Sequence, residues 1–98
     1  MSLPVVLRHE AQVEFDEAFD YYEGQRAGLG LVFAARVQKV CDRIGANPQL
    51  HAVVFADVRK AAVVRFPHRV FYRVEAARVE VIAVLHTARD PGTMRGRV

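Results

Sequence analysis

Hydrophobic and polar residues follow two different periods along the chain, and the period changes near residue 10 and again near residue 50. Residues 3–8 alternate apolar with other positions, which predicts a short first strand whose early proline suits a strand start or edge. From Glu10 onward, apolar residues recur every three or four positions and acidic residues occupy the others. This spacing predicts an amphipathic helix with an acidic outer face. Its apolar positions are Ala11, Phe15, Ala18, Phe19 and Tyr22.

The helical period is interrupted by glycines and then resumes. Gly24 and the segment Gly28-Leu29-Gly30 break it, and Asn47-Pro48 ends the second stretch. The short break predicts two antiparallel helices joined by a tight loop. Apolar residues of the second helix are Leu29, Phe33, Val37, Val40 and Ile44.

The remaining chain carries β-branched and aromatic residues in four runs, which are residues 53–58, 61–66, 69–75 and 79–86. From Val79 to Leu85 the last run is apolar at both parities apart from Glu80, which predicts an interior strand buried on both faces, with the first strand beside it. We therefore expect an α+β fold: an N-terminal strand, an antiparallel two-helix hairpin, and a three- to four-stranded, mainly antiparallel sheet. We expect residues 1–98 to form one domain and residues 90–98, which lack periodicity, to form a loose tail.

Composition narrows the setting of this domain. The chain has 98 residues, of which 52% are hydrophobic and 26% charged, as in ordinary globular proteins. The single cysteine, Cys41, cannot form an intramolecular disulfide, and no signal peptide pattern opens the sequence. No apolar run approaches the ~20 residues that a membrane-spanning helix needs. We expect a cytoplasmic protein that does not enter a membrane.

Charge is distributed unevenly. Residues 1–50 hold 5 Lys and Arg against 7 Asp and Glu, whereas residues 51–98 hold 9 against 4. Arginine, which grips phosphates and carboxylates in a bidentate way, supplies 12 of the 14 cations. This asymmetry predicts an anionic partner for the second half of the chain.

Strand parity suggests where that partner binds. Arg59 and Arg65 are an even number of residues apart, as are Arg69 and Arg73, so on continuous strands each pair would lie on one face of the sheet. The apolar residues at the intervening positions would then face the helices. One open sheet face would then present four guanidinium groups to an anionic partner. The same pattern is equally typical of arginines that merely solvate an exposed sheet face.

His86 is the one residue whose position suggests acid–base chemistry. It ends the last strand close to Arg89, where an imidazole could accept a proton from a ribose 2′-hydroxyl while arginines hold the phosphate. Alternatively, it caps the strand end with a hydrogen bond. The remaining histidines and Cys41 show no metal-ligand spacing, and the Gly28–Gly30 segment lacks the context of a phosphate loop, so we expect neither a metal nor a cofactor.

Taken together, several motifs resemble one family across nearly the whole chain. They are Ala18-Phe19-Asp20-Tyr21-Tyr22-Glu23, Gly28-Leu29-Gly30 with Phe33, Asn47-Pro48, Val58-Arg59-Lys60, Arg65-Phe66-Pro67-His68-Arg69-Val70-Phe71-Tyr72-Arg73-Val74, and Val84-Leu85-His86-Thr87-Ala88-Arg89-Asp90-Pro91. In order and spacing they resemble the RelE/ParE superfamily of toxins from type II toxin–antitoxin systems. Phe66-Pro67 and Leu85-His86 look closer to its ParE-like branch, which includes plasmid stabilisation proteins.

The resemblance implies a cognate antitoxin that wraps the toxin, and a possible homodimer within the toxin–antitoxin complex. It also implies one of two activities. ParE-like toxins inhibit DNA gyrase by binding, whereas RelE-like toxins cleave messenger RNA on the ribosome, for which Arg59, Arg65, His86 and Arg89 lie near the expected catalytic positions. No tyrosine follows Tyr72 and Lys60 is the only lysine in the second half, which departs from the RelE-like pattern and favours the inhibitor. A third alternative is a non-toxic module that binds its antitoxin or DNA.

Overall fold

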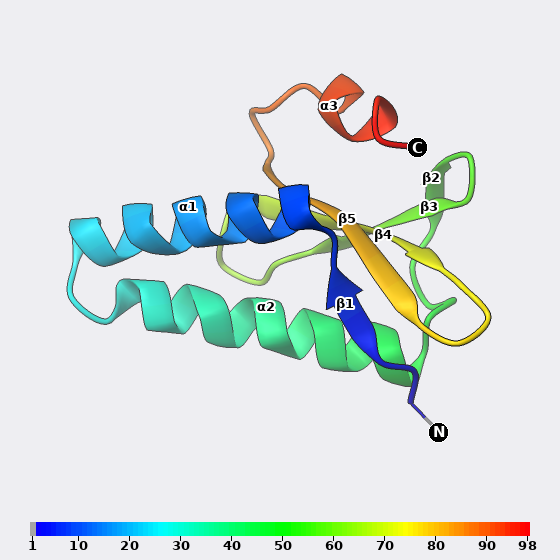
Figure 1. Ribbon diagram of the computed structural model, residues 1–98. Helices are drawn as coiled ribbons and strands as arrows, with labels where there is room; N and C mark the ends of the chain where they lie inside the picture. The colour runs from blue at the N-terminus through cyan, green and yellow to red at the C-terminus, as the bar shows by residue number, and fades with distance from the viewer. Residues whose placement is uncertain (1) are drawn as a thin grey trace.

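A hairpin of two long helices packs on one face of a twisted sheet, and a short C-terminal helix lies on the other side (Figure 1). The structure is a computed structural model that describes residues 2–98. Its elements are β1 (Val5–Leu7), α1 (His9–Gln25), α2 (Leu29–Ala46), β2 (Val53–Phe55), β3 (Val58–Ala62), β4 (His68–Val74), β5 (Val79–His86) and α3 (Gly92–Arg95).

The five strands form one mixed sheet in the order β1-β5-β4-β3-β2. β1 runs parallel to β5, and every other neighbouring pair is antiparallel. The predicted α+β fold is therefore confirmed, with four strands after the hairpin. β5 lies between β1 and β4, and its residues from Val81 to Leu85 are buried, as its two-sided apolar pattern predicted.

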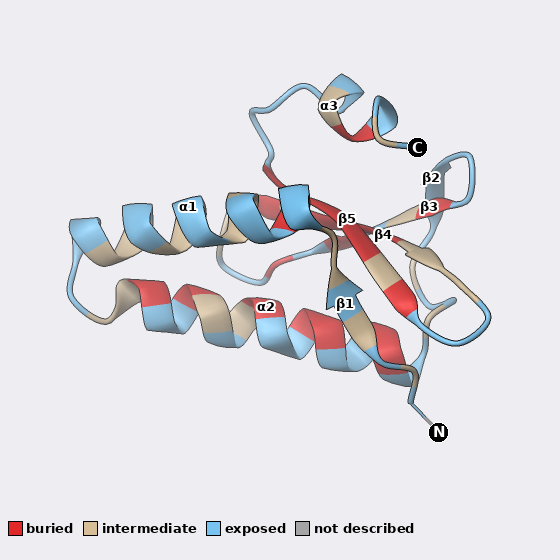
Figure 2. Ribbon diagram, in the orientation of Figure 1, coloured by how far each residue is buried: buried red, intermediate tan, exposed pale blue. Residues whose placement is uncertain are grey.

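The main core lies between the helices and the sheet (Figure 2). Phe33 and Ile44 of α2 and Tyr72 of β4 are fully buried there. Phe33 contacts Tyr22 and Phe66, with ring centroids 5.2 and 5.1 Å apart. A smaller cluster lies on the opposite sheet face and consists of Val58, Phe71, Ile82, Ala83, Leu85 and Met94.

Two of the predicted strand boundaries are wrong. A turn at Ala56 and Asp57 separates β2 from β3, and Ala56 adopts a positive φ of 51°. β3 then ends at Ala62, and Arg65 lies in the following turn with a φ of 69°. Neither residue is a glycine, so the positive φ angles were not signalled, although Asp57 and Pro67 close by are residues that favour turns.

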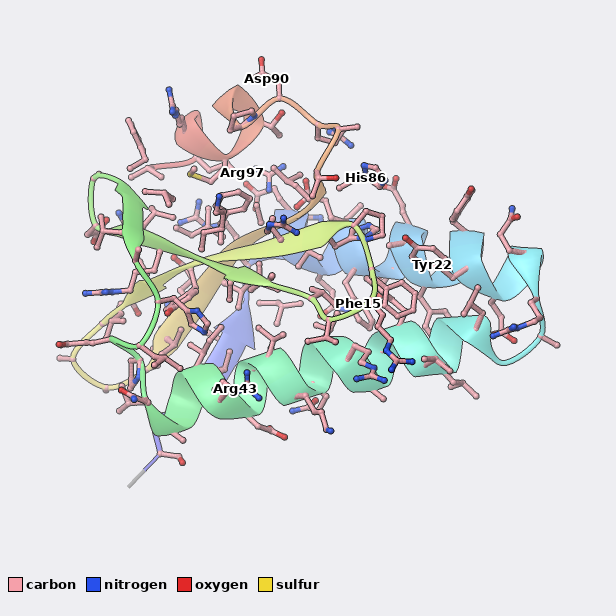
Figure 3. All side chains as sticks on the ribbon, turned by 180° about the vertical axis from the view of Figure 1, so that it is seen from behind. Phe15, Tyr22, Arg43, His86, Asp90 and Arg97 are labelled. Atoms are coloured by element: carbon pink, nitrogen blue, oxygen red, sulfur yellow. The ribbon has the colours of Figure 1, made fainter. Side chains whose placement is uncertain are left out.

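The expectation of a loose tail over residues 90–98 is also wrong. Met94 of α3 is 1% exposed and packs on the second cluster. Arg97, which is labelled in Figure 3, forms a two-pronged ion pair with Glu14 of α1, both contacts measuring 2.9 Å. It also donates to the Ile82 carbonyl. β1 pairs with β5 only as far as Val81, so within residues 2–98 the backbone of β5 beyond that residue has no neighbouring strand on this side. The ion pair lies at this position, and Glu14 also accepts a hydrogen bond there from the Val84 N–H at 3.0 Å. The tail is thus docked by Met94, by this ion pair and by the Arg8 guanidinium, which donates to the Arg97 carbonyl at 2.7 Å.

Candidate functional site

The four arginines predicted to share a sheet face do not share one. In the β3–β4 register, Arg59 pairs with Tyr72 and Ala61 with Val70, so odd residues of β3 lie on the same face as even residues of β4. That is the face packed against the helices. The odd residues of β4 lie on the open face, as expected. The odd residues of β3 were expected there too, but they lie on the helix side, because the turn between the two strands sets the register.

Two of these arginines already have partners within the fold. Arg59 donates to the backbone carbonyls of His51 and Gln49, at 2.6 and 3.4 Å. Arg73 forms a two-pronged ion pair with Asp57, at 2.9 and 3.2 Å. The hydrogen bond from Arg73 lowers the pKa of the Asp57 carboxyl. Both arginines therefore hold the β2–β3 region in place.

The other two arginines are separated. Arg65 lies exposed in the turn after β3, whereas Arg69 lies on β4 at the open sheet face. The guanidinium of Arg69 donates only to the carbonyl of its neighbour His68, at 3.1 Å. Of the four predicted residues, only Arg69 lines a hollow on the open face.

That hollow, which we call the basic hollow, gathers three cations from different elements. Lys60 of β3, Arg69 of β4 and Arg89 beyond β5 surround a floor formed by Phe71 and Leu85. The hollow measures about 240 Å³, and its floor residues are 6% and 3% exposed. Within residues 2–98, none of the three cations forms an ion pair. A group with a negative charge beside an apolar portion fits this arrangement.

A second depression, the α1 groove, lies on the other side of the β5 end. It measures about 510 Å³ and is open to solvent. Its walls combine helix and sheet residues, and His86 and Arg89 line both it and the basic hollow. Its lining residues are Glu14, Glu17, Ala18, Tyr21, Tyr22, Pro67, His68, Val84, His86 and Arg89.

His68, which sequence patterning did not single out, is the buried histidine at this junction. It is 6% exposed, its Nδ1 lies 3.3 Å from the Tyr22 hydroxyl, and its ring centroid lies 5.1 Å from that of Phe33. Burial, and to a smaller extent the adjacent His86, lower the pKa of His68 to about 4. His68 is therefore neutral near pH 7 and acts as a packing and hydrogen-bonding residue.

His86 is exposed at the end of β5, with its ring centroid 5.3 Å from that of His68 (Figure 3). Its Nδ1 accepts a hydrogen bond from the Ala88 N–H at 2.9 Å. A neutral imidazole that accepts at Nδ1 carries its proton at Nε2, so the exposed nitrogen is a donor rather than a base. This hydrogen bond is the one expected if His86 caps the end of the strand. For Nε2 to accept a proton, the hydrogen bond between the Ala88 N–H and Nδ1 would first have to break.

The structure also describes the remaining candidates for chemistry. Within residues 2–98, no three histidine, cysteine or carboxylate side chains come together as a group able to hold a metal ion. Cys41 is buried in α2, and this burial raises the pKa of its thiol to about 11, which suppresses the reactive thiolate. No helix in the described part of the chain has the length and apolar character to cross a membrane.

Comparisons with known proteins agree with this architecture. Residues 5–91 match the family described as "ParE toxin of type II toxin-antitoxin system, parDE". No curated protein matches the sequence. Among solved structures, the chain is similar to one described as "Chromosomal ParDE TA system from P. aeruginosa", with a TM-score of 0.75 and 13% identity. The similarity covers 87% of this chain and 96% of that one, and at such low identity it concerns the fold alone.

Proposed function

The chain belongs to the family of ParE toxins of type II toxin–antitoxin systems, and from this premise we propose that it inhibits DNA gyrase by binding and is neutralised by a cognate antitoxin. The family match over residues 5–91 carries the proposal. The proposal puts the chain in the cytoplasm, where gyrase acts. A homodimer within the toxin–antitoxin complex stays a prediction.

The basic hollow is the surface that we assign to the anionic target. Lys60, Arg69 and Arg89 form no ion pair within residues 2–98, so binding there need not break an existing one. Arg59, Arg65 and Arg73, which the sequence suggested for the same role, are placed outside it by their own contacts or by the turn. An inhibitor that acts by binding needs such a charged surface but no general base.

One observation favours the alternative activity, cleavage of messenger RNA on the ribosome. His86 and Arg89 line the same hollow as Lys60 and Arg69, so cationic groups that could hold a phosphate lie beside an imidazole. The Nδ1 bond of His86 to the Ala88 N–H argues against a basic Nε2. We therefore keep the ribonuclease as the second candidate.

The deciding experiment adds the purified chain, free of antitoxin, to a gyrase supercoiling reaction and to ribosomes translating a defined message. We expect supercoiling to be lost while the message stays intact. The double variant Lys60→Ala/Arg89→Ala should weaken inhibition by about tenfold, since each charged contact contributes about 1 kcal/mol or less. Arg26→Ala, which removes an exposed cation from the end of α1, serves as the control.

Other outcomes separate the alternatives. Message cleavage that leaves supercoiling unaffected and disappears in a folded His86→Ala variant would establish the ribonuclease and reject gyrase inhibition. Cleavage that persists in this variant would reject His86 as the acid or base. If expression of the chain alone leaves growth unaffected and neither reaction responds, the chain is a non-toxic module that binds its antitoxin or DNA.

A further inference from the structure

One edge of the sheet remains without a neighbouring strand beside the second half of β3. β2 is matched only to Val58 and Arg59, so β3 beyond Lys60 has β4 on one side alone. The Val63 N–H donates to the His68 carbonyl of the β4 side, and Ala61 pairs with Val70. Because backbone groups alternate in direction along a strand, those of Ala62 point away from β4. Within residues 2–98, the Ala62 N–H has no hydrogen-bond partner.

The side chains along this edge leave it accessible. Lys60 and Ala62 are exposed, and Val64 beyond the strand end is 51% exposed. Sheet edges of this kind can pair with an added strand, and proteins that must prevent it usually cover or shorten them. Here, neither a helix nor a loop among the described residues hydrogen-bonds to the outward groups of Ala62.

Next to this edge, α2 presents a row of cations. Arg36, Lys39 and Arg43 line one small hollow together with Ala62 and Val64, so the cations and the edge border the same space. Their spacing of three and four residues places them on one side of the helix. Figure 3 shows Arg43 on α2, with β3 running above that helix. None of the three forms an ion pair within residues 2–98.

The charges of α2 are segregated between its two flanks. Asp42 lies on the flank toward β1, where it accepts a hydrogen bond from Gln38 and lines a hollow with Leu3 and Val5. No acidic side chain lines the hollow at the β3 flank. We call the backbone edge of residues 61–64 together with Arg36, Lys39 and Arg43 the basic edge.

We propose that the basic edge binds an extended acidic segment of the antitoxin, which adds as a strand next to β3 and directs its carboxylates toward Arg36, Lys39 and Arg43. A peptide strand offers N–H and C=O groups in regular alternation, which a strand edge requires, whereas a nucleic-acid backbone offers charged phosphates without that alternation. A second copy of this edge would bring the same cations against each other. The antitoxin as the source of the segment rests on the proposed function, while the acidic, extended chemistry rests on the edge itself.

The dimensions are compatible with this binding mode. A strand rises ~3.3 Å per residue, so carboxylates at alternate positions recur every ~7 Å on one face. Along α2, positions three and four residues apart are separated by ~4.5 and ~6 Å. The long side chains of lysine and arginine cover the difference. A segment with acidic residues at alternate positions can therefore pair with the edge and with the helix cations at once.

The test uses the full chain and a fluorescein-labelled peptide of about seven residues in which glutamate alternates with valine, long enough to span the edge at ~3.3 Å per residue. We expect saturable binding by anisotropy and amide shifts that centre on Ala62 and Val64. Binding should weaken by about tenfold in Arg36→Glu/Lys39→Glu and as the salt concentration rises. Arg26→Glu should change it by less than about twofold, because this exposed cation lies at the far end of α1.

A second variant isolates the backbone contribution. Ala62→Pro removes an N–H that does not bond to β4, and proline is tolerated on strand edges, so the sheet should persist while peptide binding falls by about tenfold. If this variant fails to fold, the charge-reversal variant decides alone. A matched peptide with glutamine in place of glutamate should bind more weakly in either case.

Three results would overturn the inference. One is equal peptide binding by the charge-reversed and unmodified chains. Another is a set of amide shifts centred on Lys60, Arg69 and Arg89 of the basic hollow rather than on the edge. The third is a thymidine oligonucleotide that binds through Arg36 and Lys39 when the acidic peptide does not. Gyrase inhibition is measured in parallel on the unmodified chain and on Arg36→Glu/Lys39→Glu. Inhibition by the unmodified chain without saturable peptide binding would reject this inference alone, whereas retained inhibition with weakened peptide binding in the variant supports it.

Discussion

We expect Glu14→Ala to destabilise the chain through the docked C-terminal segment. Glu14 accepts two hydrogen bonds from Arg97 at 2.9 Å and one from the Val84 N–H at 3.0 Å, and it is 12% exposed as a side chain. The substitution leaves the Arg97 guanidinium without its carboxylate partner beside the Ile82 carbonyl. It also leaves a β5 backbone donor without an acceptor.

The magnitude follows from how easily these groups can reach water. Removing one partner of a fully buried ion pair costs about 3–5 kcal/mol. Here the side chains of Arg97 and Glu14 are 16% and 12% exposed, so water can reach the guanidinium once its carboxylate partner is removed. The remaining cost comes from the unsatisfied Val84 N–H and the lost charge-assisted hydrogen bonds. Together they should lower the free energy of unfolding by about 2 kcal/mol. For a chain of this size, that corresponds to a fall in melting temperature of about 8–16 °C.

The assay is urea unfolding followed by circular dichroism, with Glu17→Ala as the control. Glu17 lies three residues further along the same helix, is exposed and forms no hydrogen bond through its side chain within residues 2–98. A Glu14→Ala/Arg97→Ala double variant should lose less than the sum of the two single losses, by about 1 kcal/mol or more. Equal stability of the Glu14 and Glu17 variants would refute the role of the ion pair, and additive losses would refute the coupling.

Two further predictions concern pH and close packing. Because burial lowers the pKa of His68 from 6.5 to about 4, its neutral form favours folding; its contribution is full above pH 6.5 and falls by up to about 3 kcal/mol as the pH drops toward 4. Urea unfolding should show a smaller loss over this range in His68→Gln, and an equal loss would contradict the assignment. Gly30→Ala should cost about 1–3 kcal/mol, because a Cβ would lie 2.8 Å from the Phe19 carbonyl oxygen. Gly24→Ala, with no atom within 4 Å of its Cβ, should instead be neutral or stabilising by up to about 1 kcal/mol, and a similar loss in both would reject the packing argument.

Local patterns were sufficient for the elements whose environment is uniform along their length. The two helices follow from apolar residues at helical spacing, since one side of each contributes to the main core cluster. β5 followed from an apolar run at both parities, because it is buried on both faces. The family resemblance, carried by motifs in a fixed order, matched the family found over residues 5–91.

The candidate site depended on contacts that local patterns do not encode. The face on which Arg59 lies was decided by the turn at residues 63–67, since a shift of one residue in register exchanges the two faces of a strand. Arg73 and Arg59 were removed from the site by partners distant in sequence, Asp57 and the carbonyls of residues 49 and 51. Lys60 and Arg89 entered it because β3 and the end of β5 lie on either side of β4.

The sequence by itself determined the order of the two long helices and the strands, the burial of β5 and the excess of cations in the second half of the chain. Only the tertiary structure decided which cations are free, that the C-terminal segment docks through Met94 and Arg97, and that His86 accepts a bond at Nδ1. The physical reason is range. Periodicity reports the average environment of one element, whereas strand register, ion pairing and tail docking depend on atoms that are close in space and distant along the chain.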